Sequence, residues 1–255
     1  NGLFVRRDLA EFAGMETTFE ASVISTLAKG QKIASYLKSG DSLRAEGQFI
    51  KEDSTDNLVV IGDTIIELPV SEVLDGLVTF AYPDFGIYIW RSQRFFLSIR
   101  CGPVGQNGNG GHAHNDQLAI ELNIDGEDWI ADPGTYLYTP SPKERNSYRS
   151  VHAHAAPRLG AQEPARLDLG MFRLEDKTRG RCLSFGPDGF VGTHKGYGTP
   201  LQRCIEFQAG SIRILDMGSA TEQSEVKPIA IKDAKSLREL WKLDVSFSPG
   251  YGRKD

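Results

Sequence analysis

The chain has 255 residues, a net charge of −5, 40% hydrophobic residues and 25% charged residues. That size and composition suit one large globular domain, or a large domain with part of another. The sequence has no block rich in lysine and arginine, and no apolar run near the ~20 residues of a membrane-spanning helix. Nucleic acid is therefore not an expected partner, and membrane insertion is not expected.

The first 50 residues are predicted to be mainly helical. Within residues 8–15 and 21–30, apolar side chains recur at spacings of three and four, as they do on one face of a helix. From about residue 79 the pattern changes to short aromatic and β-branched runs separated by turn residues, which is typical of strands. We therefore divide the chain into a helical segment, 1–50, and a β domain, 51–255.

The clearest predicted strand covers residues 117–124, because Leu118, Ile120 and Leu122 share one face. Asp125-Gly126 follows it as a hairpin turn. Many short strands without alternating helices predict a mainly β fold, an antiparallel β-sandwich. The predicted strands are 79–82, 86–91, 95–100, 117–124, 129–131, 165–174, 181–185, 189–194, 202–208 and 211–217.

Four of the five histidines form two His-Ala-His pairs, at 112 and 114 and at 152 and 154. Residues i and i+2 of an extended strand project from the same face, so two such pairs can aim their imidazoles at one point. Imidazole is a common zinc ligand, and a carboxylate often completes such a site. Asp116 and Asp132 are the nearby acids. We interpret the pairs as a functional site rather than as ordinary hydrogen-bonded histidines.

Other side chains near the pairs also suit catalysis or binding. Tyrosine acts as a general acid or base when its pKa is lowered, and Tyr136, Tyr138 and Tyr148 lie between the two pairs. Arg145 and Arg149 can bind a carboxylate through two parallel hydrogen bonds, or form surface salt bridges. His194 lies at the end of a predicted strand.

Four motifs follow one another along the β domain: Gly102-Pro-Val-Gly, Gly111-His-Ala-His-Asn-Asp-Gln-Leu, Trp129-Ile-Ala-Asp-Pro-Gly-Thr-Tyr and Arg145-Asn-Ser-Tyr-Arg-Ser-Val-His-Ala-His. Their order and spacing resemble the C-terminal domain of heparinase II/III-like polysaccharide lyases. The likeness spans roughly residues 80–252. It implies a β-sandwich that packs on a preceding α/α toroid, of which residues 1–50 are the tail.

The resemblance also implies an activity, the cleavage of an acidic polysaccharide by β-elimination. In this family a metal, usually zinc, is held at the positions of His114, Asp132 and His154, and His112 faces the substrate cleft. A tyrosine of the linking segment assists proton transfer. The family further implies a periplasmic or secreted location.

Two catalytic and two binding residues follow from this likeness. His112 and Tyr148 are the expected catalytic pair, with Tyr138 as the second candidate tyrosine. Arg149 and His194 are the expected substrate-binding residues. In the family the toroid supplies further catalytic groups, so activity is expected from the full-length lyase rather than from this chain alone.

β-Elimination beside a uronic acid needs three things: a neutralised carboxylate, a base for the C5 proton and an acid for the leaving oxygen. Histidine and tyrosine can be base and acid, and cationic or hydrogen-bonding groups can stabilise the enolate-like intermediate. Heparin-like, alginate-like and bacterial exopolysaccharide chains all suit such a site.

The geometry leaves the carboxylate ligand open. A regular hairpin at residues 125–128 pairs Asp132 near Glu121, on the order of 20 Å from His114 at ~3.3 Å per residue. Either the segment 111–116 bends back over the sheet, or Asp116 replaces Asp132. In addition, Ala155 follows His154 where the family usually has asparagine.

Two other functions remain open. A non-catalytic β-sandwich module, for carbohydrate binding or structure, uses the metal only to pin its loops, and then His112→Ala leaves the function intact. A metal-dependent hydrolase uses a metal-bound water as nucleophile, and then the products are saturated.

Overall fold

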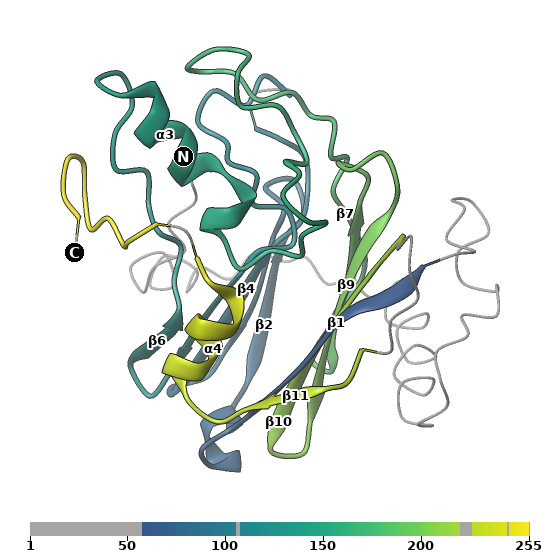
Figure 1. The fold of residues 1–255 in the computed structure, drawn as a ribbon. Helices are drawn as coiled ribbons and strands as arrows, with labels where there is room; N and C mark the ends of the chain where they lie inside the picture. Colours follow the sequence, from purple (N-terminus) through teal and green to yellow (C-terminus); the bar gives the residue numbers. More distant parts are fainter. Residues whose placement is uncertain (1–57, 106–107, 220–225, 244, 255) are drawn as a thin grey trace.

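The computed structural model describes residues 58–105, 108–219, 226–243 and 245–254. The helices predicted within residues 1–50 lie outside the described residues. Two β-sheets pack face to face as a sandwich (Figure 1), which confirms the predicted mainly β fold class. All neighbouring strands are antiparallel except one parallel pair at an edge.

The six-stranded sheet contains, from edge to edge, β11 (Ile229–Ile231), β1 (Val59–Glu67), β10 (Ser211–Gly218), β9 (Leu201–Gln208), β8 (Gly189–His194) and β7 (Arg181–Gly186). The five-stranded sheet contains β2 (Val78–Tyr82), β3 (Ile87–Arg91), β4 (Phe95–Arg100), β5 (Ile120–Ile124) and β6 (Glu127–Ile130). The parallel pair is β1 with β11.

The core lies between the sheets and is dense in aromatic rings. Trp90 of β3 contacts Phe185, Phe190 and Phe207 of the opposite sheet, with ring centroids 4.9, 6.5 and 5.3 Å away. Its indole Nε1 donates a hydrogen bond to the Gly186 carbonyl at 2.8 Å, so the buried polar atom is satisfied. These contacts fix one sheet on the other, so the loops at the ends of the sandwich are attached to a rigid core.

Short helices occur outside the sheets: η1 (Ser71–Leu74), α3 (Pro142–Arg149), η2 (Val151–Ala153) and α4 (Ala234–Trp241). The side chain of Ser141 caps α3, and Pro142 stands in its first turn, where proline is favoured. The sequence pattern predicts no helix there, because α3 is too polar to show an apolar stripe. None of the described helices has the length and apolar character needed to cross a membrane.

The strand predictions differ from the structure in four places, one of which is β11, an edge strand that the sequence pattern does not predict. Val59–Glu67, a short apolar run in the sequence, forms β1. Residues 165–174 form a loop instead of a strand, and Gly170 there has φ 121°, a conformation that side-chain-bearing residues avoid. The strand predicted from residue 117 begins at Ile120, because Leu118 has φ 62°. The remaining predicted strands are confirmed to within two residues at each end.

Candidate metal centre and neighbouring polar groups

Three loops meet at one end of the sandwich, near α3 (Figure 1). His114 lies in the long connection between β4 and β5, Asp132 follows β6, and His154 follows η2. One ligand atom from each of these residues lies within 4.8 Å of the other two. Asp132 Oδ2 is 3.2 Å from His154 Nδ1, and the two imidazole centroids are 5.3 Å apart. The predicted His/Asp/His set therefore converges.

A turn after His114 removes the long separation between His114 and Asp132 that a regular hairpin implies. The Ala119 amide donates to the Asp116 carbonyl at 2.9 Å, and Leu118 adopts left-handed backbone within this turn. The chain thus reverses at 116–119 and carries His114 back toward Asp132. The expected bend exists, and it combines this turn with an earlier one at 110–113, where the Ala113 amide donates to the Gly110 carbonyl at 3.1 Å.

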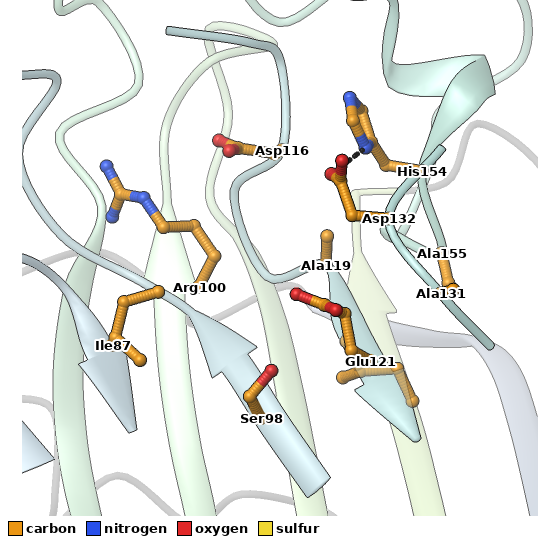
Figure 2. A pocket seen from close by; sticks show the side chains of 11 residues that line it. Ile87, Ser98, Arg100, Asp116, Ala119, Glu121, Ala131, Asp132, His154 and Ala155 are labelled. Atoms are coloured by element: carbon orange, nitrogen blue, oxygen red, sulfur yellow. Dashed lines mark ion pairs between the residues drawn. The ribbon is translucent and has the colours of Figure 1, made fainter. Parts of the chain in front are cut away.

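Asp116 lies outside the cluster. In Figure 2 the dashed line joins Asp132 to His154, whereas Asp116 stands on the neighbouring loop with its carboxylate turned away from that pair. The second oxygen of Asp132, Oδ1, accepts a hydrogen bond from the Gly134 amide at 2.8 Å, and this bond orients the carboxylate. Of the two acids that the sequence leaves open, Asp132 is the one beside the histidines.

Two buried arginines of α3 hold the loop that carries His112 and His114. Arg145 Nη2 donates to the Gly111 carbonyl at 3.3 Å, and Arg149 Nε donates to the Ala113 carbonyl at 3.1 Å. Arg149 Nη2 also donates to the Arg173 carbonyl at 2.9 Å. Both side chains are 1% exposed. Arg149, predicted to bind substrate, is therefore placed as a support of the histidine loop.

Glu163 joins the same loop to η2. Its carboxylate accepts hydrogen bonds from the Ser150 hydroxyl, from the Val151 amide at 3.0 Å and from the Asn115 side chain at 2.7 Å. Charge-assisted bonds of this kind are stronger than neutral ones. The sequence gives no signal for Glu163, because a single acid in an irregular loop matches no spacing rule.

Arg203 of β9 reaches the site from the opposite sheet. Its Nη1 donates to the carbonyls of Leu118 and Ala155, both at 2.7 Å. The same guanidinium pairs with Asp216 through two bonds of 2.7 and 2.8 Å. Leu118 lies in the turn after His114, and Ala155 directly follows His154. One buried cation therefore fixes the backbone behind both histidines.

The surroundings make the two clustered imidazoles unlike. Burial lowers the pKa of His114 well below its usual value, and the charges of His154 and Arg149 lower it further. Burial also acts to lower the pKa of His154, but the hydrogen bond and charge of Asp132 outweigh it and raise this pKa. His114 is thus held neutral, the form in which imidazole binds metals.

The donor set fits a divalent cation such as zinc. His114 Nδ1 and His154 Nε2 are buried and have no hydrogen-bond partner among the described residues, which is unfavourable for a polar atom. Zinc takes nitrogen and carboxylate ligands at about 2.0–2.2 Å, which sets ligand atoms about 3.4 Å apart in a tetrahedron.

His112 lies in different surroundings from His114. Its half-buried ring contacts Tyr138 edge-on, with centroids 5.4 Å apart, and Phe172 at 5.6 Å. Burial lowers the pKa of His112, and the charge of Arg145 lowers it further, which favours the neutral ring. Each His-Ala-His pair is expected from the sequence to lie on an extended strand, but neither pair does. The irregular backbone instead separates the members of each pair.

The remaining predicted residues lie elsewhere. Tyr148 is 1% exposed, and its hydroxyl donates to the Ser246 carbonyl at 2.9 Å. His194 is 1% exposed, its Nδ1 accepts from the Gly196 amide at 3.1 Å, and burial lowers its pKa to about 4. His152 is half-buried, with Nδ1 3.4 Å from a guanidinium nitrogen of Arg158. The structure does not bring these three side chains to the cluster.

Gly110, which opens the histidine loop, is expected to be intolerant of a side chain. It has φ 60°, and a Cβ atom there would lie 2.3 Å from the Leu174 carbonyl oxygen and 2.6 Å from Val104 Cγ1. Gly110→Ala is expected to cost about 2–4 kcal/mol of stability, because left-handed strain and a backbone clash add. Thermal unfolding measures the loss.

Gly108→Ala is the matched control for that substitution. Gly108 has φ 83°, but its Cβ atom would meet only Asp176 Cβ, at 3.5 Å. It should show the strain without the clash, about 1–2 kcal/mol. Equal losses for the two variants would contradict the close packing of Gly110 against Leu174.

The structure is thus a mainly β sandwich whose loop end carries a His/Asp/His group that could hold a metal ion. The chain belongs to the heparinase II/III-like, C-terminal family, whose sequence model matches residues 76–247. A search of curated proteins gave no match.

Two solved structures are similar to the chain. One is the heparan sulfate lyase HepC from Pedobacter heparinus, with 21% identity over 56% of this chain and a TM-score of 0.43. The other is a heparinase III gene product with methylated lysines, with 18% identity over 57% of this chain and a TM-score of 0.44. The chain spans 22% of the length of each of these two proteins.

Proposed function

We propose that this chain is the C-terminal β domain of a polysaccharide lyase that cleaves an acidic polysaccharide by β-elimination. One observation carries the proposal: in a heparinase II/III-like C-terminal domain, His112 lies against Tyr138 on the same loop that brings His114 to Asp132 and His154. An imidazole beside a phenol supplies the base and acid types that the reaction requires.

His112 is the proposed proton-transfer residue. β-Elimination removes the C5 proton of a uronic acid, forms a C4–C5 double bond and expels the glycosidic oxygen on C4, which takes up a proton. A neutral imidazole can accept a proton at a ring nitrogen, and burial together with Arg145 favours the neutral form of His112. The cationic guanidinium of Arg145 also favours the negative charge that develops on the substrate.

Tyr138 is the proposed partner of His112. Tyr148 is buried and its hydroxyl is bonded to a carbonyl, whereas Tyr138 is half-buried and contacts the His112 ring. Of the two tyrosines that the family likeness suggests, the reserve candidate therefore has the better placement. Tyr148 then serves to hold α3 against the segment that contains Ser246.

Zinc is the proposed metal, held by His114, Asp132 and His154. When bound, the metal would supply a positive charge and would cross-link the three loops that carry its ligands. The chain's own residues then do the positioning: the arginines of α3 hold the backbone on both sides of His112, and Glu163 holds the Asn115 side chain of the same loop. We further propose that a preceding helical toroid packs on this domain and completes the catalytic centre in the full-length protein.

His112→Ala in the full-length protein is expected to lower kcat on an acidic polysaccharide by about 10²–10⁴-fold, the usual contribution of a general acid or base. Metal content and the midpoint of thermal unfolding should stay at their wild-type values, because His112 lies outside the metal cluster. The measurement is the ultraviolet absorbance of unsaturated uronide products. His152→Ala, which alters the other half-buried histidine, is the control and should keep the wild-type rate.

Each competing function has its own outcome in this assay. Saturated products would favour a metal-dependent hydrolase. A wild-type protein that forms no unsaturated product from heparan sulfate, alginate or any other acidic glycan would contradict the lyase. In that case the non-catalytic module would be the better interpretation, and His112→Ala would leave carbohydrate binding unchanged.

A further inference from the structure

Three aromatic rings beside His112 form an exposed patch, made of Tyr138, Phe172 and Tyr251. Phe172 is 45% exposed and Tyr251 is 60% exposed. Tyr138 stacks on Tyr251 with centroids 6.0 Å apart and an interplanar angle of 20°, and it lies 6.2 Å from Phe172. Clustered apolar surface of this kind on a soluble domain usually marks a place where something binds.

The patch is held in place by the backbone around it. The Ser248 amide donates to the Pro133 carbonyl and the Gly252 amide to the Tyr136 carbonyl, both at 2.8 Å, and these bonds fix the segment that carries Tyr251. On the other side, the Leu174 amide donates to the Asn109 carbonyl at 3.0 Å and fixes the loop of Phe172. A preorganised surface loses little entropy when a ligand binds.

The Arg145 guanidinium lies under the patch and has no counter-charge among the described residues. The Arg145 guanidinium carbon is 5.3 Å from the centre of the Phe172 ring, and the side chain is 1% exposed. Its Nε and Nη1 have no hydrogen-bond partner among the described residues, and no described carboxylate forms an ion pair with it. A buried guanidinium that no described carboxylate pairs with favours a negatively charged ligand at the surface above it.

The size of the patch decides between kinds of ligand. Aromatic side chains bury about 150–250 Å² each, so three partly exposed rings offer roughly 300 Å². A stable protein interface needs about 800 Å² from each partner. A pyranose ring fits the smaller area, since its C–H face packs on an aromatic ring. The carboxylate of a uronic acid would in addition supply a negative counter-charge for the Arg145 guanidinium.

We propose that Tyr138, Phe172 and Tyr251 form a subsite that binds a uronic-acid-containing sugar unit next to the unit on which His112 acts. The sugar stacks on Phe172 and Tyr251, and its carboxylate lies on the side of Arg145. This inference rests on the proposed function, because it takes His112 as the neighbouring reaction centre.

The test compares substitutions in the patch with a matched substitution outside it. In the full-length protein, Phe172→Ala and Tyr251→Ala should each raise KM for a heparan sulfate or alginate octasaccharide about tenfold, with kcat changed less than twofold. Phe172→Tyr should restore the wild-type KM. The control is Phe85→Ala, since Phe85 is 57% exposed in the turn before β3, and it should leave KM unchanged.

Calorimetric titration of this chain with the same two octasaccharides gives a second measurement that does not need turnover. Phe172→Ala should weaken binding about tenfold, whereas Phe85→Ala should not. The subsite is overturned if Phe172→Ala binds as tightly as the wild type, or if the wild type binds neither octasaccharide.

The two proposals fail in different ways. If unsaturated products form and the KM of Phe172→Ala equals that of the wild type, the lyase stands and the subsite is wrong. If the wild-type chain binds an octasaccharide, Phe172→Ala loses that binding and the full-length protein forms no unsaturated product, the subsite stands and the lyase is wrong.

Discussion

Replacing Arg203 with methionine is expected to lower the free energy of unfolding by about 3–5 kcal/mol, the usual cost of removing one partner of a buried ion pair. The side chain of Arg203 is 1% exposed and binds both oxygens of Asp216 as well as the carbonyls of Leu118 and Ala155. Methionine fills a similar volume but leaves a carboxylate and two carbonyls without their donor. Urea denaturation measures the loss.

The control for this substitution exists on the neighbouring strand. Arg213 of β10 also pairs with a carboxylate through two bonds, to Asp63 at 3.0 and 2.7 Å, but its side chain is 29% exposed. Water can replace part of that interaction, so Arg213→Met should cost no more than about 1–2 kcal/mol. Similar losses for the two variants would show that Arg203 gains nothing from its buried contacts to the histidine segments.

His114→Ala is expected to lower the affinity for zinc at least about a hundredfold. A structural zinc site contributes roughly 10–16 kcal/mol through four ligands, so one ligand accounts for about 3 kcal/mol. Because His114 Nδ1 has no other partner among the described residues, nothing on its own side chain competes with the metal. Competition with a chromophoric chelator measures the affinity, and elemental analysis measures the metal content.

The same experiment tests whether the metal stabilises the fold. Chelation should lower the unfolding temperature of the wild type, since a ligand at 1,000 times its Kd contributes about 4 kcal/mol. It should have no effect on His114→Ala. The control is His152→Ala. His152 lies near Arg158 and outside the metal cluster, so this variant should keep the wild-type zinc affinity. Equal zinc affinity for His114→Ala and wild type would exclude the site.

The strands could be predicted because their side chains alternate. Ile120, Leu122 and Ile124 of β5 are buried while Glu121 and Asn123 between them are not, and this pattern is visible in the sequence. Helix α3 could not be predicted, because its helical form depends on a capping serine, a proline and tertiary bonds rather than on an apolar face. Short-range patterns thus predict the sheets and miss the elements between them.

The three residues of the candidate metal site could be predicted from the sequence, but the residues that hold their backbone in place could not. The family likeness indicates His114, Asp132 and His154, and these three residues converge. The reversal at Leu118 requires left-handed backbone in a leucine, which no propensity rule favours. Arg203 acts over 85 residues of sequence to reach the Leu118 carbonyl, and that distance exceeds any local pattern. The supports of the site thus depend on contacts between residues far apart in the sequence, which local patterns do not encode.

The hydrogen bonds at the loop end differ in kind from those of the sheets, and this difference divides the domain into two units of stability. Ladders of amides and carbonyls hold the strands, so a strand opens only when its neighbours open with it. The segments around His112 and His154 have fewer such ladders, and single side chains, those of Arg145, Arg149, Glu163 and Arg203, add to backbone bonds such as the one from the Asn115 amide to the Arg149 carbonyl. Each of these bonds can break while the sandwich stays folded. We therefore expect the loop end to open locally at a free-energy cost below that of global unfolding.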